Sequence, residues 1–476
     1  MEWLFLVMSE LQTFAGTVEE RPRPINDVVE RVGPDFGGTL ARLRGMRVFL
    51  LTVCAAALSC GPNPPAPVRV MAIVPVETGG YETREVQLQT IGNLTTLKGS
   101  VAEFVGVNRV TLDPNDPIQR GGIENLTDEQ RYEVLVKDKG SDVRGNYLDR
   151  AGVLWPADFH TWNMVTTYWN FENAYLYFQD LLASQTPAQT PDELNRMRVM
   201  YWPELKINDT VVTDNALYLS FVKSFAITPF QNEKRIPLAM NLGVIGHEVA
   251  HKVWSKRVFN DEGIHPTLRP STGWSGEPFN LLKSLDEGLA DFHGFGVTCR
   301  GLAGCRPDIL SVSIADEAYA KQRDVSRADA CLDEGLRAAL KSFSADQWIR
   351  ARELYLYGNL WAVTLYQAGS KTGGLTKVKS MQVSLLSAYN DDRAQSPGLN
   401  QLINRNLNSQ MAFTPEAVGE VIASHIADVD LRRAFCSEAM DRLQLQCMRS
   451  DCTDKMPSCP GTTRRGTTCK VLPALP

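Results

Sequence analysis

The sequence has no long run of basic residues, no internal repeat and no apolar stretch of the length that spans a membrane. Its formal net charge over 476 residues is −6. Because nucleic-acid binding usually needs clustered Lys and Arg, we expect no nucleic acid among the partners. Hydrophobic residues make up 43% of the chain and charged residues 22%. This composition is typical of a globular protein and excludes a disordered one.

The residues before position 61 have the order of an export signal. Three arginines precede the apolar run 48–58, which is shorter than the about 20 residues that a membrane-spanning helix needs. The stretch resembles a bacterial lipoprotein signal, which implies that Cys60 becomes the lipidated first residue. We therefore predict that residues 1–60 are an upstream extension and a signal, and that the protein is an exported cell-envelope lipoprotein at an outer membrane or surface. A cleaved signal and a secreted product are the alternative.

Cysteine usage agrees with export. Ten cysteines occur, and eight remain once Cys54 and Cys60 are set aside. An even number in an exported chain predicts disulfides, and the absence of a Cys-x-x-Cys pair disfavours a zinc knuckle. Three of the eight lie in the body of the chain and five lie from Cys436 onward. Because both numbers are odd, full pairing within the chain requires at least one disulfide between tail and body.

Composition along the chain predicts three regions after the signal. Residues 61–150 contain short β-like runs broken by Gly, Asn and Asp, and predict a small β-rich region. Residues 151–435 form the main domain, which is mostly helical beyond Pro237. Residues 436–476 are a Cys-rich tail with little apolar periodicity, which we expect disulfides to hold in place.

Local patterns in the main domain predict individual elements. Residues 161–182 have apolar residues at helical spacing, and residues 213–222 alternate as a strand does. Ser344 and Gln347 form a capping-box pattern, which predicts the start of one long helix through residue 369. Thr414 followed by Pro415 predicts another helix start.

The segment His247-Glu248-Val249-Ala250-His251 is the strongest indication of chemistry. Residues four apart lie on one face of a helix, so both imidazoles can reach one metal ion. Glu248 lies about 100° around the axis and can face a water on that ion. The alternative is a core helix with two hydrogen-bonded histidines. Apolar residues along one stripe support the helix: Leu242, Ile245, Val249 and Val253.

A third protein ligand is needed for a catalytic zinc site. Glu287 and Asp291 are again four residues apart and can share a face of a second helix. Glu287 can bind the metal while Asp291 accepts the outer N–H of a ligand histidine. Three other residues remain possible ligands without such a paired partner: Asp286, Glu262 and His265.

The blocks HEVAH at 247–251 and DEGLADF at 286–292 resemble the gluzincin metallopeptidases, which include thermolysin and fungalysin. The resemblance implies an α+β fold, with a small twisted sheet, a mainly helical lobe and zinc between them. It implies that zinc is bound by His247, His251 and Glu287. It also implies Glu248 as general base and Asp291 as the outer partner of a ligand histidine. Residues 215–216 would lie on an edge strand, where Asn215 and Ala216 hold the substrate backbone.

The sequence departs from this family where the transition state is stabilised. Thermolysin-like enzymes place a Tyr between the two metal motifs, and residues 252–286 contain none. His293 and His425 are the only later histidines. His293 is six residues from Glu287 and points to another helix face, which predicts a structural role. His425 stays a candidate for the missing donor.

These residues together predict a zinc-dependent metalloendopeptidase that acts on a peptide or protein substrate. In this hypothesis, water on zinc attacks the peptide bond and Glu248 serves as general base. Two alternatives remain open. One is a surface-anchored binding or structural lipoprotein in which zinc clamps two helices, and the other is a peptidase acting on its own amino-terminal region.

Overall fold

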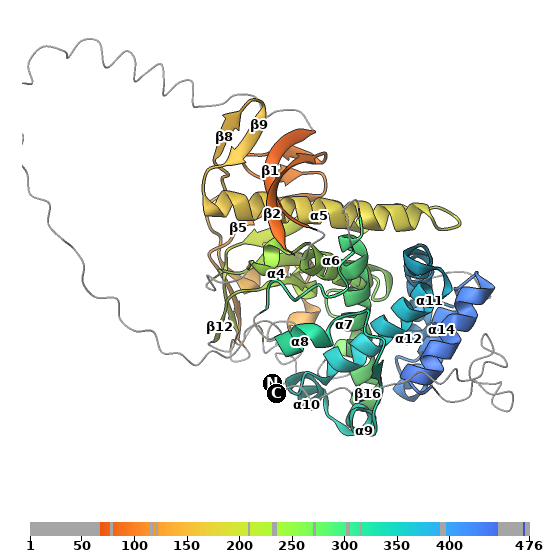
Figure 1. Cartoon of the computed structure of the whole chain (residues 1–476). Coiled ribbons are helices and arrows are strands. Elements are labelled where there is room, and N and C mark those ends of the chain that lie inside the picture. Colours follow the sequence, from red (N-terminus) through yellow and green to blue (C-terminus); the bar gives the residue numbers. More distant parts are fainter. Residues whose placement is uncertain are drawn as a thin grey trace, which may run out of the picture.

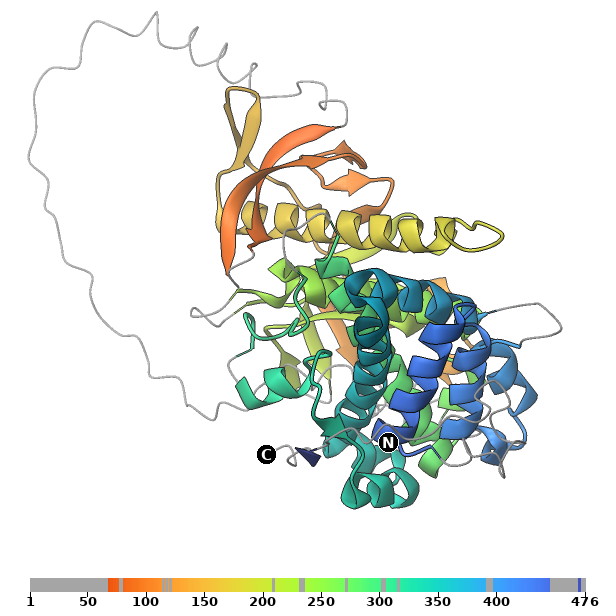
Figure 2. The same ribbon diagram turned by 45° about the vertical axis from the view of Figure 1, so that its right-hand side comes forward.

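A computed structural model gives the fold of the main part of the chain (Figures 1 and 2). It describes residues 67–76, 80–113, 116, 119, 122–207, 210–230, 236–269, 273–300, 305–314, 317–390, 397–445 and 470–471. Within these residues the protein is mixed α/β, with 11 α-helices and several small sheets. The export signal and the lipid anchor predicted at Cys60 lie outside the described residues.

Three sheets contain four or more strands each. The first has the order β2-β1-β9-β8, with β2 at Tyr81–Leu88, β1 at Val68–Pro75, β9 at Val153–Pro156 and β8 at Tyr147–Arg150. The second has the order β13-β14-β10-β5-β4-β3, with β13 at Ala216–Leu219, β14 at Ser224–Ile227, β10 at Met197–Tyr201, β5 at Ala102–Gly106, β4 at Lys98–Gly99 and β3 at Ile91–Asn93. The third has the order β12-β11-β6-β7, with β12 at Thr210–Val212, β11 at Glu204–Ile207, β6 at Arg109–Leu112 and β7 at Val136–Asp138.

Strands from the predicted amino-terminal region pair with strands from the main domain. β5 runs parallel to β10, and β6 runs parallel to β11. β1 runs parallel to β9, with Val70 opposite Leu154. The sheets therefore cross the boundary predicted at residue 150. The single small sheet expected from the sequence is replaced by several, because long-range parallel pairing of this kind leaves no local pattern.

Helix α5 (Phe159–Ala183) runs between the first sheet and the helical part of the molecule (Figures 1 and 2). Its start is capped by Asp158, whose side chain accepts a hydrogen bond from the Thr161 N–H at 2.8 Å. Thr167 and Asn170 both donate to the carbonyl of Ala239, each at 3.1 Å. These two hydrogen bonds join α5 to the segment that leads into the helix with the first metal motif.

Helices α6 (Leu242–Arg257) and α7 (Gly276–Thr298) carry the two metal motifs and pack closely together. α6 begins after Asn241, whose side chain accepts from two amide groups of the first turn. The helix therefore starts at Leu242, five residues after Pro237, and follows a short 3₁₀ turn at Leu238–Met240. The predicted apolar stripe of α6 is buried. A Cβ on Gly246 would lie 3.2 Å from the Cα of Gly294, so glycine permits this helix approach.

Helix α11 (Glu353–Tyr389) packs along α7 and has a kink at Gly373 and Gly374. The predicted capping box at Ser344 and Gln347 is confirmed, but it opens the short helix α10 (Ala345–Arg350). Arg352 has φ 59° and separates α10 from α11, so the one long helix expected from residue 345 is two. The remaining helices are α4 (Asp128–Leu135), α8 (Glu317–Gln322), α9 (Glu334–Ser342), α12 (Leu399–Arg405), α13 (Pro415–Ser424) and α14 (Val429–Arg442).

Disulfides and a small sheet fix the carboxyl-terminal part. Cys299 and Cys305 are bonded to each other. Cys331 is also disulfide-bonded, to neither of these two, and so is Cys436. Cys331 lies in β15 (Ala330–Cys331), which pairs with β16 (Lys470–Val471) of the predicted tail. A disulfide between tail and body stays a prediction that this arrangement supports. Among the helices that the structure describes, none combines the length and apolar character needed to cross a membrane.

Candidate metal centre

Two histidines of α6 and one glutamate of α7 converge on a single point. Nε2 of His247 lies 2.9 Å from Nε2 of His251. Oε2 of Glu287 lies 3.5 Å from the first nitrogen and 3.9 Å from the second. Ligand atoms about 2.0–2.1 Å from a tetrahedral zinc ion are separated by about 3.3 Å from one another. The three side chains therefore form a group that could hold a metal ion, as the sequence predicted.

Each histidine has a carboxylate on its outer side. Nδ1 of His247 lies 2.9 Å from Oδ1 of Asp291, and Nδ1 of His251 lies 2.7 Å from Oδ1 of Asp286. A metal-binding histidine commonly donates its other N–H to a carboxylate, which fixes its tautomer and orientation. Asp291 thus lies where the sequence predicted. Asp286, which the sequence left open as a ligand, contacts the outer nitrogen of His251 instead.

Two buried cations lie behind these carboxylates. Arg323 donates to both oxygens of Asp291, from Nε at 2.6 Å and from a terminal nitrogen at 2.7 Å. The other terminal nitrogen of Arg323 donates to the hydroxyl of Tyr319 at 2.9 Å. Lys283 Nζ lies 3.2 Å from Oδ2 of Asp286. Neither cation was predicted, because Arg323 follows Asp291 by 32 residues without a recognisable motif.

The charges in this cluster shift the pKa values in opposite directions. Burial alone would lower the pKa of His251, but Asp286 and Glu287 outweigh it and raise that pKa to about 10. Burial alone would raise the pKa of Asp286, but His251 and Lys283 lower it to about 2. With neutral imidazoles, the four carboxylates at 248, 286, 287 and 291 exceed the two cations by two charges. A divalent cation would balance that excess.

Glu248 lies between the metal motif and the edge of the six-stranded sheet. Its Oε2 accepts a hydrogen bond from the backbone N–H of Tyr218 in β13 at 2.7 Å. Burial raises the pKa of the Glu248 carboxyl above its ordinary value. A carboxylate with a raised pKa is suited to accept and return a proton near neutral pH. Glu248 is therefore held at the side of the metal group, next to an edge strand.

The strand predicted over residues 213–222 is shorter, because β13 spans Ala216–Leu219 and Asn215 directly precedes it; β13 is an edge strand that pairs with β14. Asn215 and Ala216 are both buried, with exposed fractions of 3% and 0%. The backbone N–H of Asn215 donates to Oγ1 of Thr228 at 2.8 Å, and its carbonyl accepts from the Thr228 N–H at 2.9 Å. The structure thus places this strand beside Glu248, while the Asn215 backbone bonds to Thr228.

The centre is enclosed in the part of the chain that the structure describes. His247, His251 and Glu287 are each less than one-tenth exposed. A cavity of about 20 Å³ adjoins His251, with a volume that suits a single water molecule. Eight of its lining residues are charged or polar: Tyr218, Ser220, His251, Ser255, Glu262, His265, Lys283 and Asp286.

His265 lines the small cavity that adjoins His251, while His293 and His425 contact other residues. Nδ1 of His265 lies 2.9 Å from Oγ1 of Thr267, and burial with Arg269 lowers its pKa to about 4. His293, on another face of α7 as predicted, contacts Tyr177. His425 follows α13, with Nδ1 2.7 Å from the carbonyl oxygen of Val421. These contacts assign no histidine as the transition-state donor, which the sequence left unassigned.

No protein-family model matches the chain, and no curated protein matches it. The likeness to gluzincins therefore rests on the two motifs and on the geometry of His247, His251 and Glu287.

Proposed function

We propose that the protein is a zinc-dependent metalloendopeptidase of the gluzincin kind. The observation that carries this proposal is the convergence of His247, His251 and Glu287, with Glu248 held beside them at an edge strand. Three nitrogen and oxygen ligands leave one coordination position for water, as catalytic zinc sites do. Structural zinc sites usually have four protein ligands, mostly Cys or Cys and His.

The chain's own residues suit the remaining chemistry. Zinc held by the three ligands would activate water and polarise the scissile carbonyl. Glu248 would take a proton from that water and pass it to the leaving amine, which its raised pKa favours. Asp286 and Asp291 would keep the imidazoles oriented. An extended peptide would align along β13 at Asn215 and Ala216 by strand addition.

A peptide substrate would need access to a buried metal group. The metal group and β13 are buried, and the adjoining cavity has about 20 Å³. Binding of a peptide therefore requires an opening movement before hydrolysis. The same burial favours a second candidate function, in which zinc clamps α6 to α7 without catalysis. The two differ in the fourth ligand, which is water in a peptidase and a protein group in a clamp.

Purified protein tests the peptidase proposal through its zinc content and its cleavage of a fluorogenic peptide library, with and without a chelator. We expect about one zinc per chain and cleavage that the chelator abolishes. Glu248→Gln keeps the size of the side chain and removes the base, so zinc should stay while cleavage almost disappears. Val253→Ala is the control, because Val253 is buried on the apolar stripe and should affect only stability. Cleavage by Glu248→Gln at the parent rate would contradict the proposal.

We further propose that the protein is exported and anchored to the cell envelope through lipid on Cys60. Metabolic labelling with a fatty acid should mark the protein. Cys60→Ala should lose the label and leave the membrane fraction. A soluble mature form without label would contradict the anchor.

A further inference from the structure

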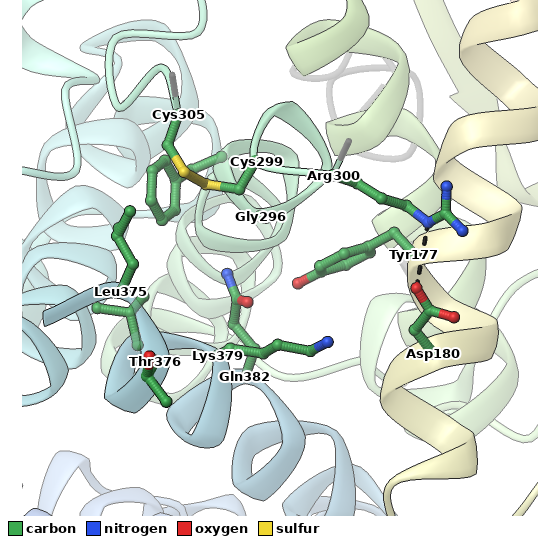
Figure 3. Close-up of a pocket in the computed structure, with 12 residues that line it drawn as sticks. Tyr177, Asp180, Gly296, Cys299, Arg300, Cys305, Leu375, Thr376, Lys379 and Gln382 are labelled. Carbon is green, nitrogen blue, oxygen red and sulfur yellow. Dashed lines mark hydrogen bonds and ion pairs between the residues drawn. A yellow bond between two sulfur atoms is a disulfide. The ribbon is translucent and has the colours of Figure 1, made fainter. Parts of the chain in front are cut away.

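A second site lies near the carboxyl-terminal end of α7, on a face of the helix other than the one that carries Glu287 (Figure 3). The pocket has a volume of about 330 Å³, at the lower end of the about 300–1,000 Å³ typical of small-molecule sites. α5, α7 and the part of α11 after its glycine kink contribute its walls, and the Cys299–Cys305 disulfide lines one side. Twelve residues line the pocket, and none of them is one of the three candidate metal ligands.

The pocket has an exposed rim and a buried floor. Leu375 at the rim is 53% exposed, which is unusual for a large apolar side chain of this protein. Tyr177 and Gln382 at the floor are 5% and 3% exposed. A Cβ on Gly296 would overlap with the Tyr177 hydroxyl and the Gln382 amide. Glycine at this position therefore lets two polar groups reach the floor of a largely apolar pocket.

The floor offers a hydrogen-bond donor. Oη of Tyr177 lies 2.9 Å from Nδ1 of His293, which is fully buried. Nε2 of His293 has no hydrogen-bond partner in the described residues. An unpaired buried N–H costs more than an unpaired acceptor, so the proton of the neutral ring belongs on Nδ1. His293 then donates to Tyr177, and the Tyr177 O–H is left to donate elsewhere. Figure 3 shows this hydroxyl directed into the pocket.

The charges at the mouth favour an anion. Arg300 pairs with Asp180 at 3.2 Å, so these two charges balance. Lys379 lines the same pocket, is exposed and makes no ion pair with the residues that the structure describes. Figure 3 shows its side chain extending from α11 toward the α5 side. One uncompensated positive charge above an apolar cavity complements a ligand with one negative charge.

We propose that this pocket binds a small monocarboxylate with an apolar body. The apolar body lies between Phe295, Val378 and the disulfide, and the carboxylate accepts from Tyr177 and pairs with Lys379. Gln382 already donates to the carbonyl of Phe292 at 3.3 Å, and its amide sits beside the same end of the ligand. The inference is independent of the proposed peptidase function, because no metal ligand takes part.

Calorimetric titration tests the proposal with two probes, octanoate and phenylbutyrate, each compared with its uncharged amide. We expect saturable one-to-one binding of a carboxylate with a Kd at or below about 1 mM. The matching amide should bind about threefold to fivefold more weakly, because it lacks the pairing with Lys379. Lys379→Met should remove that preference. Tyr177→Phe should weaken carboxylate binding about fivefold through loss of the hydroxyl donor.

Two further variants control for folding and position. Lys377→Met makes the same change two residues away, where the side chain pairs with Asp428 and does not line the pocket, so binding should be unchanged. Thr376→Trp adds bulk at the exposed rim and should abolish binding with the melting temperature preserved. The proposal is overturned if neither carboxylate binds. Equal binding of carboxylate and amide, or binding that survives Thr376→Trp, would also overturn it.

Discussion

His251 of α6 and His293 of α7 are both buried, and both have one ring nitrogen within 3 Å of an oxygen. His251 contacts the carboxylate of Asp286, and its pKa is raised to about 10. His293 contacts the phenol of Tyr177, and burial lowers its pKa to about 3. Because both rings are buried, the charge of the partner decides whether the pKa of each histidine rises or falls.

The same contrast separates the two sites. At the metal group, carboxylates surround the imidazoles, and buried cations hold those carboxylates in turn. A divalent cation fits there because negative charge is in excess. At the pocket, the floor is neutral and the charges lie at the rim. That arrangement offers a hydrogen bond and one positive charge, which suits an organic anion and gives a metal no ligand set.

The largest effect is expected from breaking the buried ion pair behind the metal group. Arg323→Met leaves Asp291 as a buried, unpaired carboxylate and should lower the free energy of unfolding by about 3–5 kcal/mol. Arg300→Met at the pocket rim breaks the partly exposed pair with Asp180 and should cost about 0–1 kcal/mol. Urea unfolding measures both. An equal loss in the free energy of unfolding for the two variants would contradict the difference between the buried ion pair at the metal group and the partly exposed ion pair at the pocket rim.

Exchanging single histidines for glutamine should separate the sites by metal affinity. His251→Gln removes a ligand nitrogen and should weaken zinc binding by more than about 100-fold, since loss of an outer partner alone costs about 10- to 100-fold. His293→Gln lies on the same pair of packed helices and should leave zinc affinity unchanged. Competition with a chromophoric chelator reports both affinities. Zinc loss from His293→Gln would place the metal elsewhere.

A smaller effect should follow from neutralising the outer carboxylates one at a time. Asp286→Asn and Asp291→Asn keep the shape of the side chain and remove its charge. Each should weaken zinc binding by about 10- to 100-fold while leaving the three ligands in place. The same chelator competition applies, with Asp180→Asn at the pocket rim as the control. Unchanged affinity in both variants would show that the carboxylates do not support the histidines.

A further effect concerns stability at acid pH. The pKa of His293 is about 3 in the folded protein and about 6.5 in an unfolded chain, so the unfolded state binds the extra proton between these values. Stability should therefore fall as pH drops below about 6.5, and His293→Gln should remove roughly 1.4 kcal/mol of that fall per pH unit. Urea unfolding at several pH values between 7 and 4 measures the difference. Parallel pH profiles for parent and variant would contradict the neutral His293.

The metal ligands could be predicted because their spacing is local. Residues four apart share a helix face, so His247 with His251, and Glu287 with Asp291, were readable as two pairs. The partners of these pairs depend on how α6 and α7 pack, which the spacing leaves open. The spacing therefore indicates Asp286 only as an alternative ligand, whereas in the structure its carboxylate contacts Nδ1 of His251.

Other features escaped because distant segments or single residues create them. Arg323 reaches Asp291 from a turn after α8, and the parallel pairing of β5 with β10 joins segments nearly 100 residues apart. Arg352 interrupts a pattern that is helical on both sides by adopting a positive φ. The pocket near the end of α7 depends on the missing side chain of Gly296, which no periodicity reveals.

Anomalous diffraction at the zinc edge, from crystals of the zinc-loaded protein, tests most directly whether α6 and α7 form an open metal centre. We predict one strong peak per chain, about 2.0–2.1 Å from Nε2 of His247, Nε2 of His251 and an oxygen of Glu287. The fourth position should hold water, and Glu248 should lie beside it without binding the ion. A peak at another site, or a fourth protein ligand on the ion, would contradict the open centre.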